Sequence, residues 1–338
     1  MEWFRNFLTN RSQFVFLNGC RSSFAPVPCG VPQGSLLGPL LFITYINDIQ
    51  MSSDRLSFIL FADDSNLFFS HSNPNHLLNT INTELIQVSD WIKANKLSLN
   101  VQKTNYMIYS NTISSLPGNI IFDNIAIQKV NSTKFLGVII DNKLSWKLHI
   151  DNICKTVSRN VGVINKLKHF FPTRILFMLY STLILPYINN GILAWGNANK
   201  SDLNRLLLIQ KKAIRIVTNS GYRSHTNVLF FENNILKITD LYLFQLGQFM
   251  FKLNRHDLPH IFQDMFLKNS SVHHYPTRQT DSYHLPLTRT LFAYRTLTFT
   301  GPNFWNSLHK DYKDAPSLNT FKRKLKKLLL IKYKQAIE

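Results

Sequence analysis

The chain has 338 residues, 45% of them hydrophobic, which is enough for two or three globular domains and excludes a disordered chain. Its three cysteines, Cys20, Cys29 and Cys154, show no paired metal-ligand spacing, and their odd number argues against a disulfide framework. Residues 1–5 do not resemble a signal peptide, and the longest apolar run, near residues 175–185, is too short to span a bilayer. We therefore expect an intracellular protein without a membrane segment.

The charge is strongly basic and unevenly distributed, with a formal net charge of +19 at pH 7. Residues 1–145 contain 10 Lys and Arg against 9 Asp and Glu, whereas residues 146–338 contain 28 against 10, a net charge of +18. So basic a surface repels itself, which indicates a polyanionic partner. The mixing of basic residues with Tyr, Phe and Asn favours nucleic acid over a membrane. The alternative is a solvated basic surface without a partner.

The chain begins with a predicted short helix over residues 3–8 and then a strand in which Phe14, Phe16 and Val15 are expected to be buried. Residues 29–35 follow as a turn with two glycines and one proline, which fix the backbone and leave it open to close approach by a ligand or another backbone.

A helix is expected directly after this turn. Ser35 can cap it, Pro39 fits its first turn, and the pattern ends near Asn47. Taken alone, a turn followed by a helix is a common arrangement and indicates no function.

Two apolar, strand-length runs, residues 56–62 and a second one from Leu67, predict a β-hairpin with Asp63 and Asp64 at its tip. Adjacent carboxylates repel each other, and beside an apolar hairpin they are costly unless a cation neutralises them. Oxygen ligands on a rigid tip suit Mg²⁺ or Mn²⁺. A solvated Asp-Asp turn is the alternative.

Helical periodicity over residues 77–92 predicts an amphipathic helix that covers a sheet. Alternation over residues 97–101 predicts a strand, and further strands are expected over 106–109 and over 135–140, where Gly137 marks a bend. Residues 20–140 therefore predict an α+β layer with mostly antiparallel pairing.

From Trp146 onward the pattern is mostly helical. Residues 153–167 and 203–217 each predict an amphipathic helix with a basic face. The basic residues proposed to meet a nucleic-acid backbone on these faces are Lys155, Arg159, Lys211, Lys212 and Arg215. For each helix taken alone, a basic face that contacts only solvent is as good an interpretation as one that binds nucleic acid.

The last part of the chain predicts little regular structure before its end. Residues 268–302 show little periodicity and are expected to be loops or short strands, and His273, His274 and His284 lack the partners of a metal site. Residues 321–334 contain seven Lys and Arg and no acid, which predicts a basic helix that can be removed without unfolding the rest.

Several of these features occur together as ordered motifs: residues 30–42 read GVPQGSLLGPLLF, residues 45–49 read YINDI, and residues 61–64 read FADD. Together they closely resemble the reverse transcriptases of non-LTR retrotransposons of the jockey-like group. The likeness continues through residues 99–104, 134–138 and 145–150 and reaches residues 301–306, so it covers nearly the whole chain.

The resemblance implies an RNA-directed DNA polymerase that uses Mg²⁺ or Mn²⁺, an RNA template, a DNA primer and deoxynucleoside triphosphates. It also implies a partial right-hand palm over residues 1–143, a thumb-like helical region over 144–225 and a basic extension over 226–338. An intracellular ribonucleoprotein, in the nucleus and cytoplasm, is the setting that it implies.

By the same resemblance, Asp63 holds both catalytic metals, Asp64 is a weaker helper, and Lys103 lies near the leaving pyrophosphate. This fits phosphoryl transfer in which two metals clamp the attacking and leaving oxygens. The residues implied to contact substrates are Gln33 and Gly34 for the template and the incoming nucleotide, and Phe135, Leu136 and Gly137 for the primer end.

The chain departs from the family pattern before Gly30. Only 29 residues precede Gly30 and none of them is Asp, whereas the family has an earlier strand with another metal-binding Asp. Since a two-metal site needs carboxylates from two strands, we expect an N-terminally truncated polymerase that is inactive alone. The alternatives are a non-catalytic nucleic-acid-binding remnant and a maturase or telomerase-like polymerase; residues 30–35 and Phe61-Ala62 fit the last two poorly.

Overall fold

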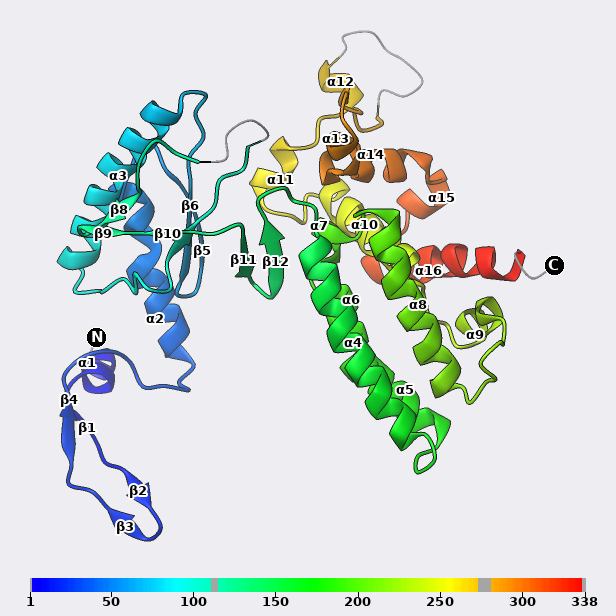
Figure 1. Ribbon diagram of the computed structural model, residues 1–338, viewed down its shortest axis with the longest axis horizontal. Helices are drawn as coiled ribbons and strands as arrows, with labels where there is room; N and C mark the ends of the chain where they lie inside the picture. The colour runs from blue at the N-terminus through cyan, green and yellow to red at the C-terminus, as the bar shows by residue number, and fades with distance from the viewer. Residues whose placement is uncertain (1, 111–114, 273–280, 336–338) are drawn as a thin grey trace. The chain divides into compact units, whose positions relative to one another are not determined.

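The computed structural model describes residues 2–110, 115–272 and 281–335, and the chain forms two compact units, Met1–Val130 and Asn131–Glu338 (Figure 1). The first unit mixes helices with short strands, and the second is almost wholly helical after one hairpin. The predicted mixture of helix and strand is thus confirmed. The two compact units meet at residue 130. This division by contacts does not test the domain limits predicted after residues 143 and 225, which stay predictions.

The first unit opens with α1 (Glu2–Leu8), as predicted, followed by two small antiparallel pairs. Strand β1 (Arg11–Gln13) pairs with β4 (Ala25–Val27), and β2 (Phe16–Leu17) pairs with β3 (Cys20–Arg21). The prediction that Phe14, Val15 and Phe16 are buried is wrong, because all three are exposed. The physical reason is that a turn with positive φ at Asn18 and Gly19 folds this segment into a two-stranded ribbon, which has no second layer over it.

Helix α2 (Leu37–Ile46) follows the glycine-rich turn, as predicted, and continues into the 3₁₀ helix η1 (Asn47–Ser52). The amide of Gly38 donates a hydrogen bond of 3.0 Å to Oγ of Ser35, so Ser35 satisfies an amide of the first turn, although Leu36 occupies the N-cap position. Strands β5 (Ser57–Phe61) and β6 (Asp64–Phe68) then form the predicted hairpin.

Helix α3 (Pro74–Ala94) is capped by Asn73, whose side chain accepts hydrogen bonds from two amides of the first turn. The apolar stripe of α3 packs on a core that includes Leu56 of the hairpin segment and Phe122. The remaining short strands pair as β8 (Ile121–Phe122) with β9 (Ile125–Ala126) and as β7 (Asn105–Tyr106) with β10 (Gln128–Lys129).

Residues 97–101 are not the predicted strand. The amide of Leu97 donates to Ile92 O and that of Val101 to Leu99 O, so this segment satisfies its hydrogen bonds locally and not across a ladder. The strand expected over residues 106–109 is also shorter than predicted, since β7 ends at Tyr106. Leu97 and Val101 are half-buried, whereas Leu99 is exposed.

The second unit opens with a hairpin of β11 (Ser132–Phe135) and β12 (Val138–Asp141). The single strand predicted over residues 135–140 is therefore wrong. Leu136 and Gly137 both have positive φ, 46° and 85°, and two such residues reverse the chain in a tight turn. Because Leu136, the first of these two residues, is apolar, the sequence pattern did not predict a turn here.

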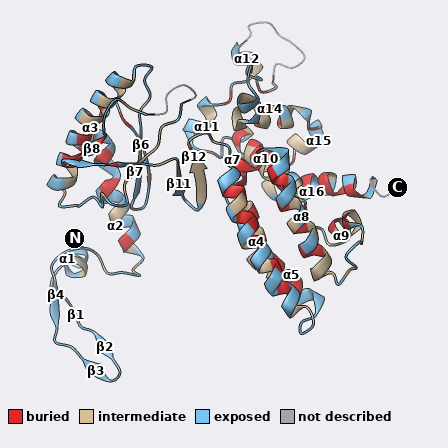
Figure 2. Ribbon diagram, in the orientation of Figure 1, coloured by how far each residue is buried: buried red, intermediate tan, exposed pale blue. Residues whose placement is uncertain are grey.

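Thirteen further helices are described in this unit, and all but two short ones contribute side chains to one core, drawn as the buried segments of Figure 2. They are α4 (Lys147–Leu167), α5 (Thr173–Leu183), α6 (Leu185–Asn189), α7 (Ile192–Trp195), α8 (Lys200–Val217), α9 (Thr226–Glu232), α10 (Ile238–Asn254), α11 (His260–Asp264), α12 (Asn269–Val272), α13 (Leu291–Arg295), α14 (Leu297–Ser307), α15 (Lys310–Lys313) and α16 (Leu318–Gln335). Among the described residues, none of the helices combines the length and apolar character needed to cross a bilayer.

The loops or short strands expected over residues 268–302 are confirmed in part: in the described part of this range, residues 281–290 form a loop with a β-bridge from Tyr283 to Lys268, whereas α12, α13 and the start of α14 are helical. Gly301 and Pro302 lie inside α14, and Gly301 packs closely there: a Cβ at this position would lie 2.7 Å from Sδ of Met250. His273 and His274 lie outside the described residues.

The predicted basic helix is present as α16, but it is an integral part of the core. Phe321 and Leu325 are 0% exposed, and the Tyr333 hydroxyl donates to the Asp240 carboxylate while it accepts a hydrogen bond of 3.0 Å from the Lys237 amide. The expectation that this helix can be removed without unfolding the rest is therefore wrong.

Candidate functional site

The paired carboxylates lie where the β5–β6 hairpin reverses. Phe61 pairs with Asp64, so only Ala62 and Asp63 form the turn, which is tighter than the tip predicted from the sequence. Ala62 has a φ of 50°, a left-handed conformation that is uncommon for a residue other than glycine. Asp63 thus lies at the turn, Asp64 is the first residue of β6, and both are exposed.

The hairpin has one buried and one open face. Side chains alternate along β5, with Phe58 packed on the core of the unit while Ile59 and Phe61 are exposed. Directly paired residues of an antiparallel ladder share a face, so Asp64 lies on the open face beside Phe61.

The donor atoms fit a divalent cation in type but not in number. Asp63 and Asp64 supply the carboxylate oxygens that Mg²⁺ and Mn²⁺ prefer. Within residues 2–110, 115–272 and 281–335, no group of three or more His, Cys, Asp or Glu is arranged to hold a metal ion. Among the described residues, Asp63 and Asp64 are thus a pair of oxygen donors without a third His, Cys, Asp or Glu beside them.

Three other predicted residues of the first unit lie in separate turns. Gln33 and Gly34 are exposed in the turn that precedes α2, where Gly34 has a φ of 78°. Lys103 is exposed in a turn after α3, with its amide bonded to the carbonyl and the side-chain oxygen of Asn100. Among the described residues, no hydrogen bond or ion pair joins these turns to the Asp63–Asp64 turn, whereas the β5–β6 hairpin holds the two carboxylates next to each other.

The predicted primer grip, Phe135, Leu136 and Gly137, forms the end of the β11–β12 hairpin in the second unit. The side-chain amide of Asn190 donates to Leu136 O at 3.4 Å, and a Cβ on Gly137 would lie 2.9 Å from the same amide nitrogen. Gly191 approaches equally closely, because a Cβ there would lie 2.6 Å from Cγ2 of Val138. The corner between α6 and α7 thus holds the hairpin turn, and glycine is required on both sides of the contact.

His149, which the sequence placed in a matching segment without a role, ties this hairpin to α4. Its ring is buried against Trp195, and Nδ1 accepts a hydrogen bond of 3.2 Å from the Ile139 amide, while Nε2 has no partner among the described residues. Burial lowers the pKa of His149 to about 4. The imidazole is therefore neutral at pH 7, and its role here is structural.

Asp141 is a second anchor of the hairpin that sequence reasoning missed. Its buried carboxylate accepts hydrogen bonds from the amides of Lys143, Ser145 and Trp146 and from the Ser145 hydroxyl, all at 3.0 or 3.1 Å. It ends β12 and satisfies amides of the turn that connects β12 to α4, before the helix itself begins at Lys147. An Asp four residues before a Ser, directly after an apolar strand, is the signal that could have found it.

The five predicted backbone-binding residues differ in their surroundings. Lys155 and Arg159 on α4 and Lys212 on α8 are exposed. Lys211 is half-buried, and Arg215 uses Nε to hold the carbonyl of Ser224 at 3.0 Å, so Arg215 fixes the loop after α8. Three of the five side chains are thus open to a partner.

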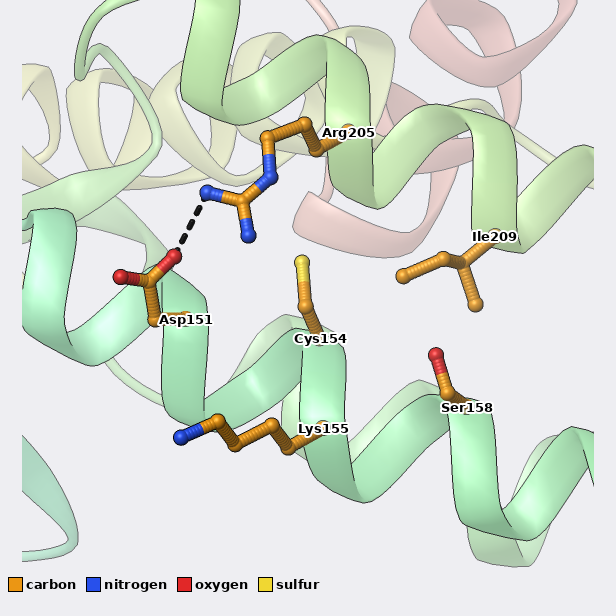
Figure 3. Close-up of a pocket in the computed structure, with 6 residues that line it drawn as sticks. All are labelled: Asp151, Cys154, Lys155, Ser158, Arg205 and Ile209. Carbon is orange, nitrogen blue, oxygen red and sulfur yellow. Dashed lines mark hydrogen bonds and ion pairs between the residues drawn. The ribbon is translucent and has the colours of Figure 1, made fainter.

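A groove of about 500 Å³ runs between α4 and α8 and was not foreseen from the sequence (Figure 3). It is lined by Asp151, Cys154, Lys155, Ser158, Arg205 and Ile209. Arg205 pairs with Asp151 at 2.6 Å and lies 3.8 Å from Asp202, which neutralises its charge. Burial raises the pKa of Cys154, so its thiol is not activated as a nucleophile. The Arg205–Asp151 ion pair links α8 to α4 across this groove, and none of the side chains that line it indicates catalysis.

The segment that contains the carboxylate turn is similar to a known protein family. Residues 1–140 match the family described as "Reverse transcriptase (RNA-dependent DNA polymerase)". The resemblance inferred from the motifs is therefore confirmed, and the matched reverse transcriptase domain includes Gln33, Asp63, Asp64, Lys103 and the β11–β12 turn.

Curated relatives extend the similarity of the reverse transcriptase domain into the second unit. The chain is 24% identical over 264 residues to the "RNA-directed DNA polymerase from mobile element jockey" of Drosophila melanogaster, which covers 75% of this chain and 28% of that protein. It is 25% identical over 263 residues to the "Probable RNA-directed DNA polymerase from transposon BS" of the same species, covering 75% and 29%. The chain thus matches less than a third of the length of these relatives. No solved structure matches the chain.

Proposed function

We propose that this chain is the part of an RNA-directed DNA polymerase that carries the Asp63–Asp64 turn and the primer-holding hairpin. The reaction is the transfer of a deoxynucleotide to the 3′ hydroxyl of a primer on an RNA template. The observation that carries the proposal is the carboxylate pair, held at a two-residue turn inside a domain that matches the reverse transcriptase family.

Asp63 and Asp64 are proposed as metal ligands, with Asp63 the principal one because it lies in the turn itself. A divalent ion bound there supplies charge neutralisation for the phosphates and lowers the pKa of the primer hydroxyl. Lys103 is exposed and is proposed to neutralise the leaving pyrophosphate. Gln33 and Gly34 are proposed to meet the template and the nucleotide, where the positive φ of Gly34 leaves the backbone uncovered.

The β11–β12 hairpin is proposed to hold the primer end through Phe135, Leu136 and Gly137. Support comes from the way in which its turn is fixed, by Asn190 on one side and by the His149 and Asp141 contacts at its base. A rigid support is what the alignment of a primer hydroxyl requires, because small misplacements of the reacting atoms are costly in rate.

The incomplete donor set has a direct consequence for activity. Two carboxylates do not balance the charge of two divalent ions, so the 338 residues alone are proposed to be inactive. The test is incubation of the purified chain with primed RNA, deoxynucleotides and Mg²⁺, in which we expect no extension above background. Extension would overturn the proposal of an incomplete site and make Asp48 the first residue to test as a further ligand.

A second candidate function is nucleic-acid binding without catalysis. The observation that favours it is the net charge of +18 on residues 146–338. Under this proposal the chain binds an RNA–DNA duplex with an affinity that falls log-linearly with salt, by roughly a thousandfold between 50 and 200 mM if about six phosphates are contacted. A slope near zero would remove nucleic-acid binding from both candidate functions.

A further inference from the structure

One end of the second unit carries exposed aromatic rings on two neighbouring corners. Arg205 pairs with Asp151 while Ile209 lies near Ser158, so α4 and α8 run parallel (Figure 3). Their C-terminal ends therefore lie at the same end of the unit, as Figure 1 also shows. The α4–α5 corner and the α8–α9 loop follow these two ends, and together we name them the end surface, made of residues 166–174 and 218–225.

The rings of the end surface are exposed although their backbones are fixed. Phe170 is 80% exposed, Phe171 43% and Tyr222 85%. The amides of Phe170 and Phe171 both donate to the Leu167 carbonyl, at 3.0 and 3.2 Å, and Pro172 follows directly. Rings on a fixed backbone lose little conformational entropy when they bind a partner.

The loop that carries Tyr222 is also closed by its own hydrogen bonds. The Ser224 amide donates to Gly221 O at 3.0 Å, and Arg215 holds the Ser224 carbonyl from α8. Tyr222 and Arg223 thus lie at the centre of a tight turn that points their side chains away from the core.

The charge around these rings is almost purely positive. Residues 152–231 contain 11 Lys and Arg and one acid, Asp202, which is buried beside Arg205. On the end surface, Lys166, Lys168, Arg174 and Arg223 form no ion pair among the described residues. A surface with free cations and exposed rings, and with no carboxylate in its own segments, is complementary to a polyanion that also offers flat apolar groups.

We propose that the end surface binds unpaired nucleotides of a single-stranded nucleic acid, with Phe170 and Tyr222 stacked on bases and the surrounding cations on phosphates. Charge alone would serve a duplex equally well, but the rings have a use only where bases are unstacked and accessible. The inference rests on the proposed function only in that the second unit meets nucleic acid, and it adds a site outside the matched domain.

The test is a titration of the full 338-residue chain against a labelled 20-nucleotide RNA, both single-stranded and annealed to its complementary DNA, followed by fluorescence anisotropy. For the double variant Phe170→Ala/Tyr222→Ala we expect single-strand affinity to fall tenfold or more and duplex affinity to change less than twofold. The slope of log affinity against log salt should not change, because no cation is removed. Lys166→Gln/Lys168→Gln should instead flatten the slope by up to two units for both ligands.

Phe292→Ala is the matched control, because Phe292 is also an exposed ring of the second unit, 54% exposed on α13, and should leave both affinities unchanged. Equal loss of single-strand and duplex affinity, or no loss, in the Phe170/Tyr222 variant would overturn the inference and leave the proposed function standing. If the unaltered chain binds neither ligand, nucleic-acid binding itself fails. If the variant loses binding to phosphatidylserine vesicles and not to RNA, the end surface meets membranes and the inference is wrong.

Discussion

At the scale of single residues, Asp63 and Asp64 differ in how the hairpin holds them, since Asp63 lies in the turn and Asp64 pairs with Phe61. In a longer chain, with the preceding part of the jockey relative's sequence fused before Met1, we expect Asp63→Asn to abolish primer extension, because it removes the charge proposed to bind both metals. Asp64→Asn should leave measurable extension. Single-turnover nucleotide addition is the measurement, and equal losses in the two variants would show that the principal ligand is wrongly assigned.

His149 gives a pH dependence whose sign follows from its burial. Its pKa in the folded chain is about 4, below the ordinary 6.5, so the unfolded state takes up the proton first as the pH falls. The His149 contribution is fully present above pH 6.5 and is lost toward pH 4, on the order of 3 kcal/mol of unfolding free energy.

The variant His149→Asn keeps an acceptor in place of Nδ1 without the titration. The difference in urea unfolding free energy between the chain and this variant should therefore shrink as the pH falls from 7 to 4. A difference that is constant with pH would mean that the imidazole is not held neutral.

At the scale of elements, the junction of β12 with α4 depends on one buried carboxylate. Asp141→Ala leaves the amides of Lys143, Ser145 and Trp146 without their acceptor, and we expect a loss of roughly 2–4 kcal/mol in unfolding free energy. The matched control is Asp151→Ala, which breaks a partly exposed ion pair with Arg205 and should cost less than about 1 kcal/mol. Urea unfolding followed by tryptophan fluorescence measures both, and equal costs would contradict the role of Asp141 in holding the β12–α4 turn.

How well an element could be predicted depended on whether its own sequence decided its structure. Helices α3, α4, α8 and α16 have long apolar stripes, and their existence and type follow from periodicity alone. Even Gln210 fits the buried stripe of α8, where it bonds the Tyr180 hydroxyl, the Leu236 carbonyl and the Ile238 amide.

The β11–β12 turn could not be predicted, because Leu136 carries no turn signal and its left-handed conformation is supported by Asn190 from a distant part of the chain. The candidate site also has parts that the local sequence decides and parts that distant contacts decide. The carboxylate turn was found from adjacent residues, whereas the anchors His149 and Asp141 act through contacts that only the folded chain reveals.

At the scale of the whole molecule, α16 carries part of the basic charge of the second unit and also packs into the core of that unit. Removal of residues 318–338 exposes the surface that Phe321, Leu325 and Leu329 cover, and we expect the second unit to lose its cooperative unfolding transition. Lys322→Gln/Lys324→Gln should instead leave thermal unfolding nearly unchanged. Near-UV circular dichroism follows both, and a truncated chain with an intact spectrum would show that α16 is dispensable after all.

The central claim is that the Asp63–Asp64 turn is one part of a polymerase site whose remaining ligand comes from a further strand. The measurement is primer extension on an RNA template with Mg²⁺, comparing the 338-residue chain, the longer fused chain and its Asp63→Asn variant. We predict extension by the longer chain alone. Extension by the 338 residues, or a longer chain that binds primed RNA and extends nothing, would contradict the account.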